Sequence, residues 1–265
     1  MSKLFKTVLL ASFLIGFSAP SFAQDAAVDP AAQAAQGVPA EQTVPADQNV
    51  PAEQTPAEQA AVPQLDQYIV YLQTEWARIN YQVTDPKVKQ QDIAELEKYA
   101  AGVTSSFADR AEPKIWEAII LSTDAGITKS ISGLPKLKNA KKLLEASLEQ
   151  DPKALNSSAY TSLGSLYYQV PGWPISFGDK DKAGKLLALA IQTNPDDIDA
   201  NYFYGDYLIE TGKYSEALQA LNHGLTVPDR PGRDVADAGR RQDIKTAIAK
   251  AEAKLGSGGA QKSNN

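Results

Sequence analysis

Cysteine is absent from the 265 residues, and histidine occurs once, as His223. Without cysteine the chain can form no disulfide, and it has no thiolate nucleophile and no cysteine that could carry a lipid anchor. His223 has no second histidine or cysteine with which to complete a zinc site. The Gly-x-Ser-x-Gly, phosphate-loop and His-Glu-x-x-His patterns are missing as well. We therefore expect no catalytic residue, no metal, no cofactor and no enzymatic activity.

A hydrophobic run long enough to cross a membrane is also missing. The apolar stretch from Val8 to Phe17 is too short for a bilayer core of about 30 Å. It follows Lys3 and Lys6 and precedes Ser21-Phe22-Ala23, which has the small-x-small pattern of a signal peptidase site. These features predict a signal peptide at 1–23 and export to the periplasm of a Gram-negative bacterium, with no direct membrane span.

Basic residues are fewer than acidic residues, 26 against 32. Removal of Lys3 and Lys6 with the leader would leave 24 basic residues and a net charge of −8. This balance argues against nucleic acid or an anionic membrane surface as the main partner.

Aromatic residues are absent from 24–63, where a proline-containing motif recurs. Val38-Pro39-Ala40-Glu41-Gln42 returns with small changes at 44–48, 50–54 and 55–59. Such a segment buries too little apolar surface to offset its ordering entropy, so we predict a disordered spacer. A proline-rich ligand motif is the alternative. The Gly-rich end, 256–265, is predicted to be a disordered tail for similar reasons.

Between the spacer and the tail, the apolar residues follow helical spacing. The first ones, Leu65, Ile69, Leu72 and Trp76, predict one helix of a pair that ends near Val103. No stretch shows convincing strand-like alternation, so the predicted class is all-α. Further helices are expected at 113–125, 136–150, 154–169, 179–193, 198–210, 214–226 and 234–254.

Two of these helix pairs share small and aromatic residues at fixed steps. In the later pair Gly205, Gly212 and Ala217 stand at a helix contact, a turn and a crossing, and Ala217 lies 34 residues after Ala183 of the earlier pair. This pattern resembles the tetratricopeptide repeat. The resemblance implies a right-handed α-solenoid of helical hairpins over 64–255, closed by a C-terminal capping helix. It also implies a non-enzymatic interaction module.

In this family ligands usually lie in a concave groove lined by the first helix of each pair. The resemblance places Thr161, Ser165 and Tyr168 on this face in one pair, and Tyr202, Asp206 and Ile209 in the next. The family's carboxylate clamp needs Lys, Arg and Asn here, and these residues do not supply them. The alternative for each tyrosine is packing within the repeat core.

An insert, 170–179, lengthens the step between the two helices of the earlier pair. Pro171 and Pro174 restrict the backbone around Trp173, which predicts a structured loop. Trp173 and Phe177 are too apolar to be left in water without a reason, so the loop either contacts a partner or packs on the domain. Its Gly-Asp end resembles a turn of exported repeat proteins that accompany TRAP-type solute transporters, although an N-cap for the next helix explains it too.

Four arginines, Arg230, Arg233, Arg240 and Arg241, lie in and after the link to the last helix. They could bind an anionic group through bidentate contacts. The aspartates interleaved with them favour local ion pairing instead.

Together these features predict a periplasmic scaffold that presents a groove to a protein or peptide of the cell envelope. The alternative is an accessory component of a TRAP-type solute transporter that binds or relays a small molecule.

Overall fold

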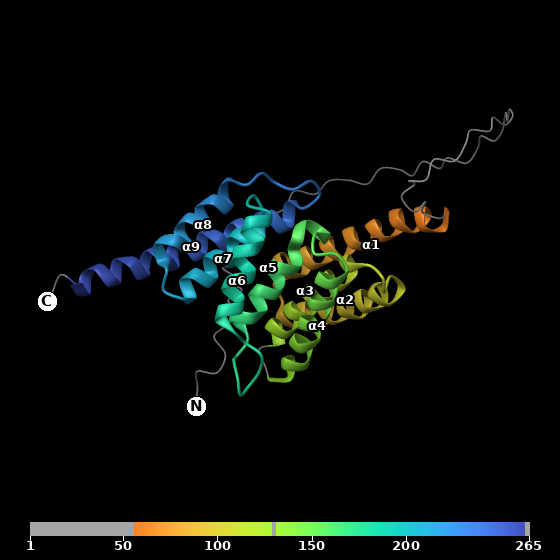
Figure 1. Ribbon diagram of the computed structural model, residues 1–265, viewed down its shortest axis with the longest axis horizontal. Coiled ribbons are helices and arrows are strands. Elements are labelled where there is room, and N and C mark those ends of the chain that lie inside the picture. The colour runs from red at the N-terminus through yellow and green to blue at the C-terminus, as the bar shows by residue number, and fades with distance from the viewer. Residues whose placement is uncertain (1–55, 129–130, 263–265) are drawn as a thin grey trace, which may run out of the picture.

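The computed structural model describes residues 56–128 and 131–262, and its regular elements are helices (Figure 1). An isolated bridge between Gly172 and Gly178 is the only β-type pairing in this part of the chain. The predicted all-α class is confirmed. The predicted signal peptide and residues 24–55 of the predicted spacer lie outside the described residues. None of the described helices is long and apolar enough to cross a membrane.

Successive helices of the described chain form hairpins, and the final helix has no hairpin partner. The pairs are α1 (Pro56–Tyr81) with α2 (Pro86–Ser106), α3 (Ala111–Thr128) with α4 (Leu134–Gln150), α5 (Ala154–Gln169) with α6 (Lys180–Thr193), and α7 (Ile198–Glu210) with α8 (Tyr214–Thr226). The final helix is α9 (Asp234–Lys262), and a short 3-10 turn, Ile131–Gly133, precedes α4. Helix α1 therefore includes 56–63, which the sequence assigned to the spacer, and α9 continues past the expected end at 254.

Three helices begin at an aspartate whose side chain accepts hydrogen bonds from their first turn. Asp85 accepts from the amides of Lys87 and Val88 at 2.8 and 3.0 Å, and Asp197 accepts from the amide of Ala200 at 2.7 Å. Asp179 caps α6 in the same way. Each such cap contributes about 1 kcal/mol to helix stability.

The two helices of a hairpin can pack closely where one of them has a glycine at the point of contact. A Cβ atom on Gly164 would lie 2.7 Å from Cγ of Leu187, and one on Gly205 would lie 2.5 Å from Cγ of Leu221. The two leucines are fully buried. The small residues of the repeat pattern thus mark the contacts between paired helices, as the sequence predicted.

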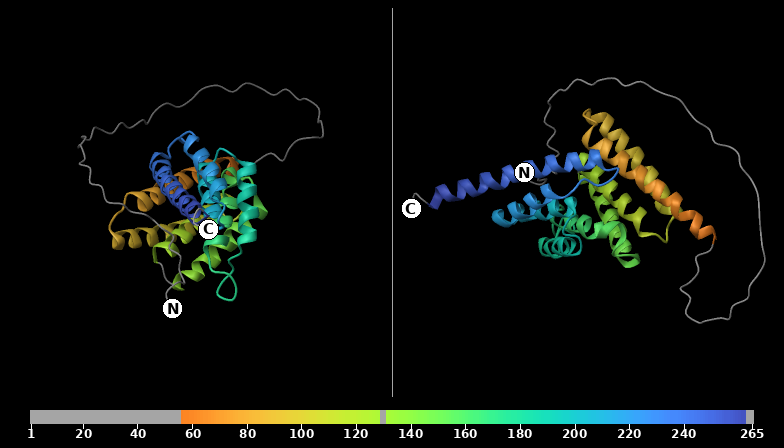
Figure 2. Two further views of the ribbon diagram at one scale, coloured as in Figure 1. Left: turned by 90° about the vertical axis from the view of Figure 1, so that its left-hand side faces the viewer. Right: turned by 90° about the horizontal axis from the view of Figure 1, so that it is seen from above.

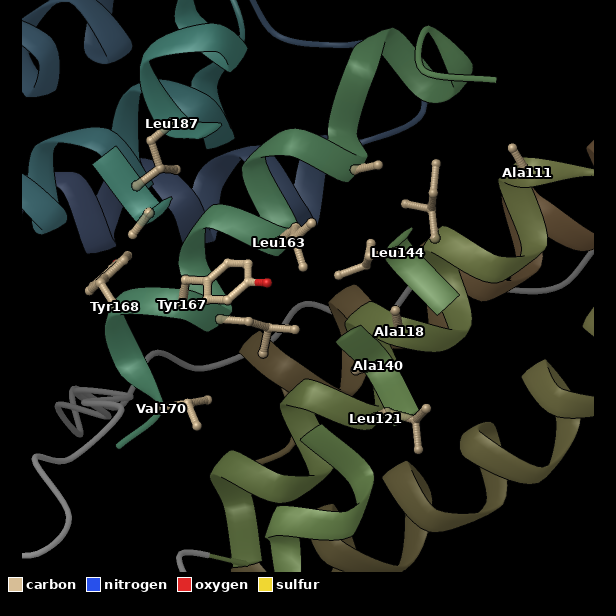
Figure 3. Packing of buried hydrophobic residues seen from close by; sticks show 14 of the residues in the cluster. Ala111, Ala118, Leu121, Ala140, Leu144, Leu163, Tyr167, Tyr168, Val170 and Leu187 are labelled. Carbon is tan, nitrogen blue, oxygen red and sulfur yellow. The ribbon is translucent and has the colours of Figure 1, made fainter. Parts of the chain in front are cut away.

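A continuous set of buried side chains joins the hairpins. The cluster between α3 and α6 includes Leu121, Leu144, Leu163 and Leu187, each at most 4% exposed (Figure 3). A second cluster fills the space between α1, α2 and α3, and it also contains Ala236 from α9. A third lies between α7, α8 and α9.

The stack is curved, and α9 lies along its inner face. The first helices of successive hairpins contact each other, α1 with α3, α3 with α5 and α5 with α7, whereas among the described residues α2, α4, α6 and α8 make no such contacts. The first helices therefore form the inner face. Helix α9 contacts α8, α7 and α1, so it spans this face from the last hairpin to the first (Figure 2).

Candidate partner-binding site

The inner face of the stack is covered by α9 where a groove was expected. Gly239 of α9 lies against the ring of Tyr81 from α1, so closely that an added Cβ would stand 2.3 Å from the ring. The Tyr81 hydroxyl donates a hydrogen bond to Asp243 of α9 at 3.1 Å. These contacts join helices that lie 162 residues apart in the sequence, and they close the face at its N-terminal end.

A charged network fixes α9 to α7. The Nε atom of Arg240 lies 2.6 Å from Oδ1 of Asp199, and its Nη1 atom lies 3.0 Å from Oδ2 of Asp243. The same guanidinium lies over the ring of Tyr202, 4.4 Å from the ring centroid. Burial alone would raise the pKa of Asp199, but the charges of Arg240 and Arg230 hold that pKa below its ordinary value. Asp199 therefore stays ionised between its arginine partners.

The six residues expected in the groove do not form an open surface. Thr161, Tyr168 and Ile209 are buried, at 6%, 8% and 5% exposure. Ser165 donates its hydroxyl proton to the carbonyl oxygen of Ser162 on its own helix. Tyr202 is half-buried under Arg240. Tyr168 packs against Tyr207 and Asp206 of α7, and Tyr202 lies under Arg240 of α9, whose position the 34-residue repeat pattern does not specify.

The remaining groove residue, Asp206, belongs to a second polar link on this face. It accepts a hydrogen bond from the Tyr168 hydroxyl at 2.8 Å, and the Lys250 ammonium of α9 lies 3.7 Å from its other oxygen. Burial raises the pKa of Asp206. The pair is thus part of the packing between α5, α7 and α9.

Three of the four candidate anion-binding arginines are paired with aspartates. Arg240 pairs as described above, Arg230 contacts Asp199 at 2.9 Å and also pairs with Asp237, and Arg241 contacts Asp229 at 2.7 Å. Arg233 has no ion pair among the described residues, and its guanidinium lies 5.4 Å from the Trp116 ring centroid. With most of their charge neutralised, the four arginines do not present a free anion site.

The insert forms a compact loop between α5 and α6, which we name the Trp loop (170–179). The amides of Ile175 and Ser176 donate to the carbonyl oxygen of Gly172 at 3.0 and 3.2 Å, and the amide of Gly178 donates to that of Pro171 at 3.0 Å. The Trp173–Pro174 peptide bond is cis. Backbone hydrogen bonds therefore hold the loop in one shape.

The Trp loop packs on the domain through one side and exposes the other. The Phe177 ring stands perpendicular to that of Tyr167, with centroids 5.8 Å apart, and is half-buried. Trp173 is 90% exposed and Ile175 is 47% exposed. The sequence left two roles open for this loop, packing on the domain and contact with a partner. Phe177 packs on the domain, whereas the exposed side chain of Trp173 is available for a contact.

Lysines of α4 adjoin the Trp loop. Together they border a pocket of about 370 Å³, whose lining residues are Lys138, Lys141, Lys142, Pro174, Ile175, Ser176 and Phe177. Lys141 pairs with Glu145 at 2.6 Å, whereas exposed Lys138 and Lys142 have no ion-pair partner among the described residues. The pocket was not predicted from the sequence, although the lysines at 136, 138, 141 and 142 are a visible signal. The surface beside Pro174 and Ile175 is therefore basic on a chain that is acidic as a whole.

No group of three or more potential metal-ligating side chains occurs among the described residues. The Gly178-Asp179 turn is accounted for by its N-cap, since Asp179 accepts from the amides of Asp181 and Lys182 at 3.0 Å. The feature that suggested a link to TRAP-type transporters thus has a local structural role.

One protein-family model matches part of the repeat pattern. The tetratricopeptide repeat family model matches residues 175–227, which include α6, α7 and α8. A crystal structure of MamA is 19% identical, covers 67% of this chain and 99% of its own, and superposes with a TM-score of 0.38. A structure of MamA MSR-1 is 18% identical, covers 75% of this chain and 98% of its own, and has the same TM-score of 0.38. The comparison with curated proteins found no match.

Proposed function

We propose that this tetratricopeptide-repeat protein is a non-enzymatic scaffold of the periplasm that holds a protein or peptide of the cell envelope at the Trp loop. The observation that carries the proposal is the 90% exposure of Trp173 on a loop that backbone hydrogen bonds hold in one shape. Proteins of this repeat class generally act as interaction modules. The proposal moves the contact from the inner face, which α9 covers, to the loop.

The energetics of association favour this choice of surface. Tryptophan is one of the residue types that most often dominate the binding energy at protein interfaces, because binding removes the large area of its ring from water. Ordering a flexible loop costs free energy upon binding, and a loop already held by its own hydrogen bonds avoids much of that cost. Trp173, Pro174 and Ile175 together offer an apolar patch beside two unpaired lysines.

The periplasmic location is supported by the signal-peptide pattern at 1–23. The alternative role, as an accessory of a TRAP-type solute transporter, was suggested by the Gly178-Asp179 turn. Because capping explains that turn, we base the proposal on the Trp loop.

Site-specific crosslinking in the living cell tests the proposal. A photoreactive amino acid at position 175 is expected to crosslink one envelope protein, and Trp173→Ala in the same chain is expected to abolish that product. The matched control is position 189, because Leu189 is also apolar and is 37% exposed on α6. Equal capture at both positions, or capture that survives Trp173→Ala, would contradict the proposed site. Recovery of the mature protein from the cytoplasm would contradict the location.

A further inference from the structure

We infer that the pocket between α4 and the Trp loop binds an acidic segment of the partner protein in extended form. The inference rests on the proposed function, because it names the chemistry of the partner that the loop holds. Lys138 and Lys142 receive two carboxylates of this segment, and Pro174 and Ile175 contact an apolar side chain beside them.

Two positive charges at this pocket have no counter-charge among the described residues. Lys138 and Lys142 line the pocket, are exposed, and take part in no ion pair there, although the chain as a whole has 32 acidic against 26 basic residues. They lie four positions apart on α4, which is the spacing at which like charges on a helix repel each other. A carboxylate bound at each lysine removes this repulsion, so the pocket favours an anionic occupant.

The third lysine of the pocket is already engaged and connects α4 to the loop. The Nζ atom of Lys141 lies 2.6 Å from Glu145 and 5.9 Å from the centroid of the Phe177 ring. This contact between an ammonium group and an aromatic ring fixes the apolar wall relative to the two free lysines. A binding site that is formed before the partner arrives loses less conformational entropy on association.

The spacing of the two free lysines indicates the spacing of the carboxylates that they receive. Four residues of an α-helix correspond to a rise of about 6 Å. In an extended chain, side chains at alternate positions lie on one side and are about 6.6 Å apart. An extended segment with acidic residues at alternate positions therefore presents one carboxylate to each lysine. An apolar residue on the same side of that segment can then contact Pro174 and Ile175.

An anionic membrane surface is the other class of partner that exposed lysines can bind. Clusters of about four to eight basic residues are typical of electrostatic binding to membranes, whereas only Lys138 and Lys142 are free of ion pairs among the described residues that line this pocket. The pocket also combines its two charges with an apolar wall over a short distance, which suits a single peptide segment. Charge and shape therefore favour the acidic peptide.

Fluorescence anisotropy of a labelled peptide measures binding to the exported protein. The probe is Ser-Glu-Ser-Glu-Ser-Ile-Ser with a rhodamine label, and its control peptide has glutamine in place of both glutamates. The double variant Lys138→Gln, Lys142→Gln is expected to weaken binding of the acidic peptide about tenfold, because two exposed ion pairs of ordinary strength are lost. The glutamine peptide should bind about as weakly to the wild type as the acidic peptide binds to this variant.

The matched control removes the same charge elsewhere on the surface. Lys87 and Lys245 are exposed on α2 and α9, so Lys87→Gln, Lys245→Gln should change the Kd by less than about twofold, since distant exposed charges are screened by salt. An equal loss of affinity in both double variants would overturn the inference, because the peptide would then respond to net charge alone. Equal binding of the acidic and the glutamine peptide would overturn it as well. So would binding of the wild type to phosphatidylglycerol vesicles that Lys138→Gln, Lys142→Gln abolishes, since the lysines would then serve a membrane.

Crosslinking at position 175 separates this inference from the proposed function. The product is expected to decrease with Lys138→Gln, Lys142→Gln and to persist with Lys87→Gln, Lys245→Gln. An undiminished product with the first pair, together with its loss in Trp173→Ala, would show a partner that contacts the loop without its acidic residues. The inference would then fail while the proposed function stands. Peptide binding that depends on the two lysines, without any crosslinked product at position 175, would instead contradict the proposed function.

Discussion

Arg240 of α9 and Asp199 of α7 form an ion pair across the inner face, with 2.6 Å between Nε and Oδ1 and only 8% of the arginine side chain exposed. Arg240→Met is expected to lower the free energy of unfolding by about 3–5 kcal/mol, because it removes one partner of a desolvated pair. Urea unfolding followed by circular dichroism measures the change. Lys245→Met, on the same helix but exposed, should change stability by less than about 0.5 kcal/mol. An equal effect of both substitutions would show that the pair does not hold α9.

Asp206 gives a prediction for the dependence of stability on pH. Burial raises its pKa in the folded state above the ordinary value of about 3.9, so the unfolded chain loses this proton first as the pH rises. The group therefore costs stability as the pH increases from about 4 through its folded pKa. Asp206→Asn should remove this cost, and each unit of pKa difference corresponds to about 1.4 kcal/mol.

The measurement is urea unfolding of the wild type and Asp206→Asn at several pH values between 4 and 7. The variant is expected to gain stability relative to the wild type as the pH rises. Its amide oxygen can still accept the hydrogen bond from Tyr168, and Lys250 keeps its contact with Glu210 at 3.1 Å. Parallel curves for the two proteins would contradict a raised pKa at this site.

Gly239 tests the contact between the last helix and the first. Gly239→Ala places a methyl group 2.3 Å from the Tyr81 ring, so the helices must separate. We expect a loss of about 1–3 kcal/mol, the usual cost of overpacking. Gly102→Ala is the matched control, because this helical glycine of α2 has nothing within 4 Å of an added Cβ. There alanine should raise stability by up to about 1 kcal/mol through its higher helix propensity.

The two aromatic side chains of the Trp loop should differ in their effect on stability. Trp173→Ala is expected to leave the melting temperature unchanged, because the side chain is 90% exposed. Phe177→Ala should cost about 2 kcal/mol, somewhat less than the 3–5 kcal/mol of a fully buried phenylalanine, because its ring is half-buried against Tyr167. Differential scanning fluorimetry of the two variants is sufficient. A large loss of stability with Trp173→Ala would place that ring in the core and remove the basis of the proposed site.

The helices could be predicted from the sequence because their signals are local. Apolar spacing, the glycines Gly164 and Gly205, and the caps at Asp85 and Asp179 each act within one helix or one hairpin. The expected ranges for α7 and α8 agree with the structure at both ends. Helix α5 has the expected bounds, but Leu155, Asn156 and Ser157 in its first turn have positive φ angles of 48°, 56° and 65°, which the sequence did not indicate. The end of α9 was harder to predict, because the glycines after Leu255 do not terminate the helix.

The candidate site was harder to predict because it depends on contacts between distant segments. The structure places the first helices of the hairpins on the inner face, but no short-range sequence pattern shows that α9 lies across this face. The contact of Tyr81 with Asp243 links residues 162 positions apart. Likewise Lys138 and Lys142 come to lie beside the Trp loop only after α4 packs against α5. The prolines around Trp173 are a local signal for a structured loop, whereas the lysines next to it are brought there by packing between helices.

The contact between α1 and α9 also changes how the chain should unfold. In an open repeat array each hairpin touches only its neighbours, so the ends can fray and unfolding can proceed in steps. Here the last helix binds the first, so the two ends of the array protect each other. Loss of either terminal helix removes contacts from both ends at once. The contacts between its two ends should make the hairpins unfold as one cooperative unit. Amide protons should then exchange with similar protection factors along the whole array.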